Sequence, residues 1–145
     1  MSDVVEHREP LISMFKVNVE DVEWEPYTRD GKEVSKVKYL LREENARAEN
    51  FYMRRFKIEP DAPAPLHRHA HEHQVYILRG EGLFLGEDGK TSPVKVGDAV
   101  FIETNELHGF KNTGDEPLEF ICIKEAPKRA AERLRQVETK TEVSC

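Results

Sequence analysis

Between Phe51 and Lys124 the apolar residues come in short runs, and residues that favour turns separate these runs. Runs of this length at close, regular spacing predict an all-β sandwich or barrel. A parallel α/β fold needs a helix between successive strands, and the gaps leave no room for one. A jelly-roll β-barrel fits the pattern, because double-sheet packing removes exposed edges. The runs predict strands at Phe51–Ile58, Leu66–His69, His73–Leu78, Leu83–Gly86, Ser92–Val96, Ala99–Glu103, Gly109–Asn112 and Leu118–Lys124.

The segment before this region, residues 1–50, predicts an N-terminal arm. Its apolar runs indicate two strands, Phe15–Val19 and Val34–Leu41, with a turn at Thr28–Gly31 between them. The charged stretch 41–50 is either a loop or a short helical turn. Trp24 has two interpretations, since it could cover the barrel or contact a second copy of the chain.

The last segment, residues 125–145, predicts a helix from Pro127 to Cys145, because proline is well placed at the first helical position. Its apolar stripe is thin, so the helix could pack on the barrel, join a dimer contact or fray. The stripe consists of Ala130, Ala131, Leu134 and Val137. The whole chain, 1–145, is predicted to be one domain: the arm 1–50, the barrel core 51–124 and the C-terminal helix or tail 125–145.

Composition narrows the partners and the compartment. The 145 residues carry a formal net charge of -6 and show no clustered basic face, which argues against nucleic acid. No apolar run approaches the ~18–20 residues that span a bilayer, so no membrane partner is expected. The N-terminus lacks the basic start and apolar stretch of a secretory signal, which predicts a cytoplasmic protein. The two cysteines, Cys122 and Cys145, are too few for a disulfide framework, and Cys145 is expected to be reduced.

Histidines are concentrated in the predicted barrel. Four of them occupy alternate positions, 67, 69, 71 and 73, and His108 follows later, while His7 has no evident role. Residues two apart on a strand share a face, so His67 and His69 point together, and His73 shares the face of Val75 and Ile77. An inward histidine must satisfy its ring nitrogens, and one metal ion can do so for several rings. The alternative is a solvated loop in which histidine is merely polar.

The segment between the histidine strands must turn, and Ala70-His71-Glu72 is where a turn fits. His71 therefore lies at the barrel mouth and is not predicted to be a ligand. Glu72 beside it could orient a ligand through a hydrogen bond.

Two motifs make the chain recognisable. His67 to Gly80, HRHAHEHQVYILRG, resembles the first cupin motif, and Gly97 to Asn112, GDAVFIETNELHGFKN, resembles the second, which ends in H-x-x-x-N. The resemblance covers about half of the chain, from Phe51 to Lys124. It implies metal ligation by His67, His69, His73 and His108, and structural roles for Gly80, Gly97 and Asn112.

The chain departs from the common cupin pattern at two positions. His73 stands where most metal cupins have glutamate, with Gln74 as the other occupant if the turn is one residue longer, and Thr104 replaces a proline. A fourth histidine resembles a subset of small single-domain cupins that often carry manganese. The resemblance thus favours one divalent manganese or iron ion, with nickel, copper and zinc as the other candidates. Many cupins pair through N-terminal strands, which makes a homodimer the expectation.

Three function classes follow for such a site. The first is a metal-dependent oxidoreductase, dioxygenase-like, acting on a small organic molecule. The second is a redox-neutral lyase or isomerase of the decarboxylase kind, in which the ion acts as a Lewis acid. The third is a non-catalytic small-molecule-binding or sensor module. The redox-capable four-nitrogen site ranks the oxidoreductase first. The glutamate missing at position 73 weakens the decarboxylase interpretation, and the lack of an obvious general base is the motive for the binding module.

Other inward positions follow from strand alternation. Arg54 shares a face with Phe56 and Ile58, so it is either a pocket cation or a rim arginine that reaches solvent. Cys122 shares a face with Phe120 and either lines the metal pocket, where oxidants would reach it, or packs in the core. Four aromatic residues are predicted to be core or pocket wall, namely Tyr76, Phe84, Phe101 and Phe110.

Overall fold

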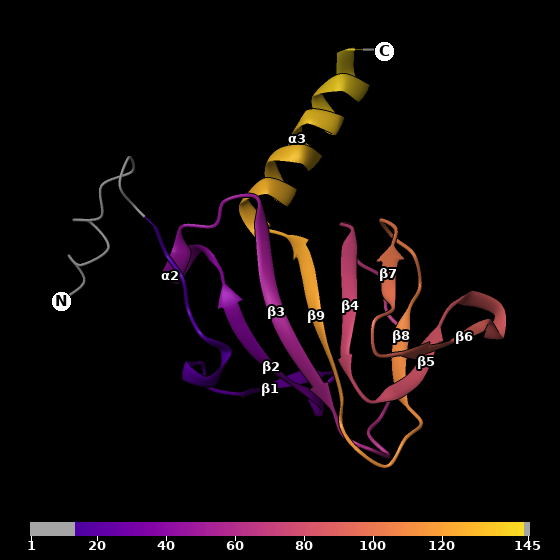
Figure 1. Cartoon of the computed structure of the whole chain (residues 1–145). Helices are drawn as coiled ribbons and strands as arrows, with labels where there is room; N and C mark the ends of the chain where they lie inside the picture. The colour runs from indigo at the N-terminus through magenta and orange to yellow at the C-terminus, as the bar shows by residue number, and fades with distance from the viewer. Residues whose placement is uncertain (1–13, 144–145) are drawn as a thin grey trace.

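A computed structural model, which describes residues 14–143, places the strands in two antiparallel sheets (Figure 1). The first sheet runs in the order β1 (Glu25–Arg29), β2 (Lys32–Leu41), β3 (Phe51–Ile58), β9 (Leu118–Glu125), β4 (His73–Arg79) and β7 (Ala99–Ile102). The second runs in the order β6 (Thr91–Lys95), β5 (Glu81–Leu85) and β8 (Gly109–Asn112). The predicted all-β class and jelly-roll architecture are confirmed.

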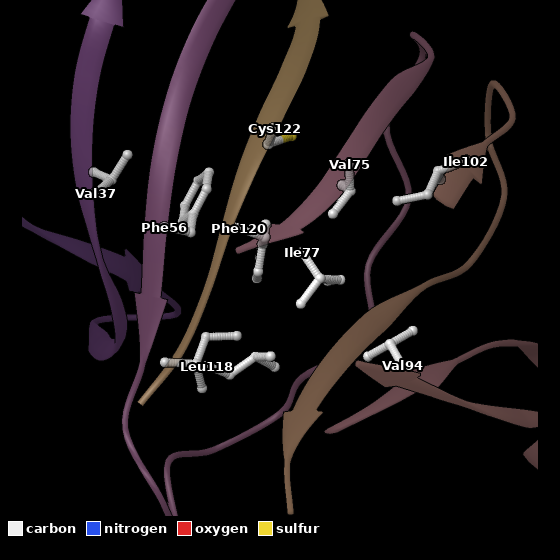
Figure 2. Close-up of a cluster of buried hydrophobic side chains, with 10 residues drawn as sticks. Val37, Phe56, Val75, Ile77, Val94, Ile102, Leu118, Phe120 and Cys122 are labelled. Carbon is white, nitrogen blue, oxygen red and sulfur yellow. The ribbon is translucent and has the colours of Figure 1, made fainter. Parts of the chain in front are cut away.

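The hydrophobic core lies between the two sheets (Figure 2). Residues alternate between buried and less buried along β3, which puts Phe56 and Ile58 on the inner face. Ile77, Ile102 and Leu118 are almost completely buried. Because strands from distant parts of the sequence supply these side chains, the core joins both predicted motifs into one unit.

The central strand β9 aligns the inner face of the large sheet into rows of cross-strand neighbours. Arg54 on β3 pairs with Cys122 on β9, and Cys122 pairs with Val75 on β4. The next row places Lys124 of β9 opposite His73. The register therefore brings charged and histidine side chains to one end of the inner face.

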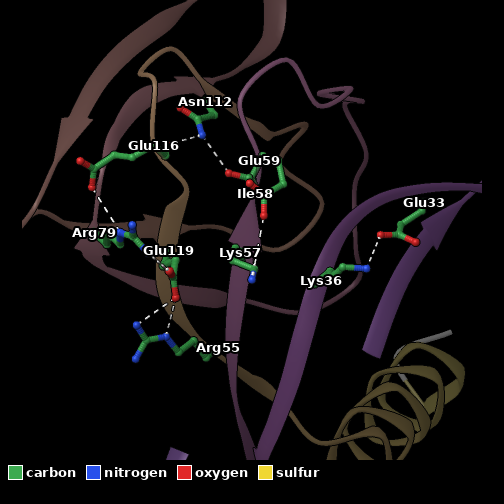
Figure 3. Close-up of polar contacts among 10 residues, drawn as sticks. All are labelled: Glu33, Lys36, Arg55, Lys57, Ile58, Glu59, Arg79, Asn112, Glu116 and Glu119. Carbon is green, nitrogen blue, oxygen red and sulfur yellow. Dashed lines mark hydrogen bonds and ion pairs between the residues drawn. The ribbon is translucent and has the colours of Figure 1, made fainter. Parts of the chain in front are cut away.

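A tight turn at Gly80 joins β4 to β5. Gly80 has a φ of 80°, and a Cβ there would collide with the carbonyl oxygen of Pro117. Asn112 secures the same end by donating from its amide to the carbonyls of Ile58, at 2.8 Å, and Glu116, at 2.9 Å (Figure 3). Gly80 and Asn112 thus have the structural roles that the cupin resemblance implies.

The outer face of the large sheet carries a buried ionic network (Figure 3). Glu119, with an exposed fraction of 5%, accepts from Arg55 at 2.9 Å and from Arg79 at 3.0 Å. Removing one arginine would leave part of a buried carboxylate uncompensated, which is strongly destabilising. The network holds β3, β9 and β4 together on the face of the sheet opposite the cavity.

The strand prediction at Phe15–Val19 is wrong. Residues 14–18 form no ladder, and Val19–Asp21 is a 3-10 helix (η1), because the Asn18 side chain caps it by accepting from the backbone N–H of Glu20 at 2.9 Å. A strand that was not predicted, β1, lies just beyond. The turn after it is shorter than expected: Asp30 and Gly31 both have positive φ, so Arg29 remains in the strand.

The strand prediction at Leu66–His69 is also wrong. Only His67 pairs, in an isolated bridge to His108, with both backbone hydrogen bonds at 3.0 Å. Pro63 and Pro65 have no N–H to contribute to a ladder, which keeps the approach to His67 irregular.

Besides η1, the described helical elements are α2 (Glu43–Ala46), a 3-10 turn η2 (Glu87–Gly89) and α3 (Pro127–Val143). The first realises the short helical turn that was one alternative for residues 41–50. In Figure 1, α3 projects from the end of β9 away from the strands, and Leu134 and Val137 on it are exposed. Cys145 and His7 lie outside the described residues.

Two of the four aromatic predictions are wrong. Tyr76 and Phe101 have exposed fractions of 50% and 51% and lie on the outer face of the large sheet, since Tyr76 stands between the inward Val75 and Ile77. Phe84 and Phe110 do pack against the core, with ring centroids 5.2 Å apart.

Candidate metal centre

Five histidine rings gather at one end of the cavity between the sheets. His67, His69 and His71 come from the segment between β3 and β4, His73 opens β4, and His108 precedes β8. The backbone bridge between His67 and His108 brings the two predicted motifs together, with their ring centroids 4.8 Å apart. The two motifs therefore meet in space, although about forty residues separate them in the sequence.

Three of these side chains satisfy the geometry of a metal site. The ligand atoms of His67, His69 and His108 all lie within 4.8 Å of one another. His108 donates from Nδ1 to the carbonyl of Glu106 at 2.8 Å, which leaves its Nε2 free to bind a cation. A backbone carbonyl that orients a ligating imidazole is a recurring feature of metal sites.

His73 lies beside this trio. Its ring centroid is 5.0 Å from that of His69 and 5.3 Å from that of His108. Its ligand atoms fall outside the group of three, so its role as fourth ligand stays a prediction.

Buried imidazole nitrogens without hydrogen-bond partners provide an independent test of whether a metal ion fits the site. Nδ1 of His67 and Nε2 of His73 are buried and have no hydrogen-bond partner among the described residues. A buried polar atom without a partner costs on the order of a few kcal/mol. A divalent ion among the rings would offset that cost, so the residues present fit a metal.

The imidazoles are neutral at physiological pH. Burial, with a contribution from the charge of Arg29, lowers the pKa of His67 to about 4. Burial and the neighbouring His67 lower the pKa of His69 to about 3, and burial and Arg54 lower that of His73 to about 2. Burial also lowers the pKa of His108. Neutral imidazole is the form that binds metal ions.

His71 and Glu72, the two residues predicted at the barrel mouth, differ in their burial and contacts. His71 is half-buried and stacks on His69, with centroids 5.2 Å apart and planes 5° apart. Glu72 is exposed, and no histidine among the described residues donates a hydrogen bond to its carboxylate. The carbonyl of Glu106 orients the His108 ring instead, and a backbone acceptor has no sequence signal.

Arg54 and Cys122 both line the cavity, as strand alternation predicts. Arg54 has an exposed fraction of only 3%, so it does not reach solvent at the rim, and its Nη2 donates to the sulfur of Cys122 at 3.1 Å. Burial raises the pKa of the Cys122 thiol, which keeps it protonated and weakly nucleophilic. A catalytic role for either residue stays a prediction.

Two further cationic side chains lie near the histidine cluster and were not predicted from the sequence. Arg29 at the end of β1 lies with Nη2 3.3 Å from Nε2 of His69 and 2.6 Å from the hydroxyl of Tyr27. Lys124 of β9 stands opposite His73 in the sheet. The alternation of β9, which places Lys124 on the face of Cys122, could have identified Lys124, whereas Arg29 was assigned to a turn.

The cavity is small and mainly apolar, with a volume of about 80 Å³. That space suits a ligand of a few non-hydrogen atoms. None of the described side chains that line it is acidic, so the positive charge there has no carboxylate counterpart. Its apolar walls include Phe56, Ile58, Val75, Ile102, Phe110 and Phe120.

Comparisons with known proteins agree with this fold and site. Residues 54–124 match the Cupin domain family model. An oxalate-binding protein from Thermotoga maritima is 36% identical over 96 residues, which is 66% of this chain and 78% of that protein. The chain belongs to the cupin superfamily.

Solved structures agree with this family assignment. The polyketide cyclase RemF from Streptomyces resistomycificus superposes with a TM-score of 0.71 at 27% identity, covering 78% of this chain and 80% of its own. A protein from Thermotoga maritima described as a predicted oxalate decarboxylase superposes with a TM-score of 0.67 at 31% identity, covering 77% of this chain and 99% of its own. A metal-binding cupin is the class that these relatives and the histidine cluster support.

Residues 14–143 contain no helix long and apolar enough to cross a bilayer.

Proposed function

We propose that this chain is a metal-dependent oxidoreductase, dioxygenase-like, that acts on a small organic molecule. The observation that carries the proposal is the convergence of neutral imidazoles, two with unsatisfied nitrogens, on a small apolar cavity. His67, His69, His108 and His73 would hold the ion. Manganese or iron is favoured, with nickel, copper and zinc as the other candidates. Bound manganese or iron would supply both a redox centre and a Lewis acid, whereas zinc would supply only the Lewis acid.

The chain's own residues would orient the ligand and keep water out. The apolar walls exclude solvent, which strengthens every electrostatic contact inside. Without an acidic side chain on the described walls, the cavity offers no carboxylate to move protons as a general acid or base. That feature favours redox chemistry over chemistry that depends on proton transfer by the protein.

The test is metal analysis of protein purified without added metal, followed by oxygen-uptake assays with small organic acids. We expect about one ion per chain in the wild type and less than a fifth of that in H108A. His71→Ala is the matched control, because it removes a neighbouring imidazole that is not a predicted ligand. If the metal-loaded protein consumes neither oxygen nor peroxide with any candidate, the oxidoreductase assignment is wrong.

A redox-neutral lyase is the second candidate, and the names of the Thermotoga maritima matches favour it. The curated match is called oxalate-binding and the solved structure a predicted oxalate decarboxylase, so a small acid is the natural first substrate. Carbon dioxide release under nitrogen, supported by zinc as well as manganese, would select the lyase. Tight binding of oxalate without turnover in either assay would select a non-catalytic binding or sensor module.

We also propose a homodimer. The outer face of the large sheet exposes three aromatic side chains, Phe51, Tyr76 and Phe101. Large apolar groups gathered on one face are typical of a surface that contacts another protein.

A further inference from the structure

We propose that the cavity contains a second anion-binding position at Arg54, so that its ligand is a small dianion of the short dicarboxylate class. One acidic group would lie at the histidine cluster and the other at the Arg54 guanidinium. This inference rests on the proposed function only in assuming a metal at the histidines. It does not depend on whether the chemistry is oxidative.

The first support is the state of the Arg54 side chain. The exposed fraction of Arg54 is only 3%, and the residue lines the cavity. Its only hydrogen bond is the one from Nη2 to the thiol of Cys122, and its Nε has no partner among the described residues. A guanidinium offers five N–H donors in a fork that matches a carboxylate. Most of that donor capacity is therefore available to a ligand.

The second support is the lack of compensating charge. Among the side chains that the structure describes, in residues 14–137, no carboxylate forms an ion pair with Arg54, in contrast to Arg55, the next residue on the strand, which pairs with Glu119. A thiol that remains protonated cannot neutralise the arginine. The Arg54 guanidinium also lies 4.8 Å from the centroid of the Phe56 ring, but an aromatic face carries no net negative charge. A buried cation without an anionic partner is unfavourable, and an anionic ligand would supply the missing charge.

Because other cations lie near Arg54, a ligand with a single negative charge would not balance the positive charge around the cavity. Lys124 stands opposite His73 in the sheet, and burial together with the charge of Arg54 lowers the pKa of Lys124. Arg29 adds another positive charge beside the cluster, with Nη2 3.3 Å from Nε2 of His69. A divalent ion at the histidines would add two more positive charges, so a dianion balances the cavity better than a monoanion.

The arrangement of the strands sets the size of the ligand. Arg54 belongs to the cross-strand row of Cys122 and Val75, and His73 belongs to the next inward row. Successive inward residues on a strand are about 7 Å apart. A cavity of about 80 Å³ then suits a chain of very few carbons between the acidic groups.

The experiment is calorimetric titration of the manganese-loaded protein under nitrogen with acetate, oxalate, malonate and succinate. The variant is Arg54→Met, which keeps the length and removes the charge and the donors. We expect its affinity for at least one of the dicarboxylates to fall tenfold or more, while its affinity for acetate changes by less than threefold. Manganese stoichiometry is measured on the same samples and should be unchanged.

Lys111→Met is the matched control, because Lys111 is an exposed residue of β8 and its loss removes one positive charge from the surface. This variant should leave the affinities for acetate and for the dicarboxylates unchanged. If R54M does not fold, as judged by its thermal melt, the comparison is made with R54K, which keeps the charge without the fork. A larger loss for dicarboxylates than for acetate again supports the proposal.

Equal losses for acetate and the dicarboxylates, or no loss for either, would overturn the Arg54 position. Absence of manganese from the wild-type protein would instead overturn the metal centre. Failure to consume oxygen would affect only the oxidoreductase assignment, because the titration involves no turnover.

Discussion

At the scale of single residues, burial decides what the histidines can do. The same five side chains in a solvated loop would titrate near pH 6.5 and compete with protons for a metal. Within the cavity, burial lowers the pKa of His67, His69 and His73 far enough to keep them neutral in moderate acid. The cluster is therefore ready to bind a cation, at the expense of stability at low pH.

This feature predicts an acid-sensitive fold in the metal-free protein. The pKa of each of these histidines is lower in the folded than in the unfolded chain, so below pH 6.5 the unfolded chain binds more protons. The free energy of unfolding should fall as the pH decreases from 7 to 5. His73→Leu should reduce this slope by up to one proton, about 1.4 kcal/mol per pH unit. Urea unfolding at several pH values measures the slope, and identical slopes in both proteins would contradict the prediction.

At the scale of elements, α3 is attached to the segment that carries the histidines. Arg133 donates to the carboxylate of Glu125 at the end of β9, at 2.8 Å, and to the carbonyl of Ala70, at 2.5 Å. Ala70 lies between His69 and His71 in the sequence. A helix that packs little apolar surface on the barrel thus restrains the histidine segment through one side chain.

We expect Arg133→Met to weaken metal binding without unfolding the barrel. A partly exposed ion pair contributes about 1 kcal/mol or less to stability, so the melting temperature should change little. The freed segment should raise the manganese dissociation constant severalfold, as measured by competition with a chelating dye. Arg135→Met on the same helix is the control, since Arg135 pairs only with Glu132 among the described residues. Equal manganese affinities in the two variants would show that Arg133 does not position the site.

At the scale of the whole molecule, the inner and outer faces of the sheets serve different purposes. The inner faces enclose the core and the cavity, whereas the outer face of the large sheet leaves Tyr76 and Phe101 exposed. Strand alternation makes this division unavoidable, because every inward residue has outward neighbours. Exposing these aromatic side chains to water has a free-energy cost that contact with another molecule would remove.

The proposed homodimer predicts a change in mass when this face becomes charged. The double variant Tyr76→Lys, Phe101→Glu should convert a dimer to a monomer in light scattering coupled to size-exclusion chromatography. Its melting temperature should stay near that of the wild type at low concentration, because both residues point away from the core. Lys95→Glu, on the exposed part of β6, is the control. A wild-type protein that is monomeric at micromolar concentration would exclude the dimer.

The sequence by itself determined the strands from β3 to β9, the turns at Gly80 and Gly97, and the set of histidines. These features depend on local alternation and on residues that favour turns, which act over a few positions. Only the tertiary structure decided that His67 bridges His108, that Arg29 reaches His69 and that Arg54 is buried beside Cys122. Those contacts depend on which strands pair and in which register, and long-range pairing leaves no short-range pattern in the chain.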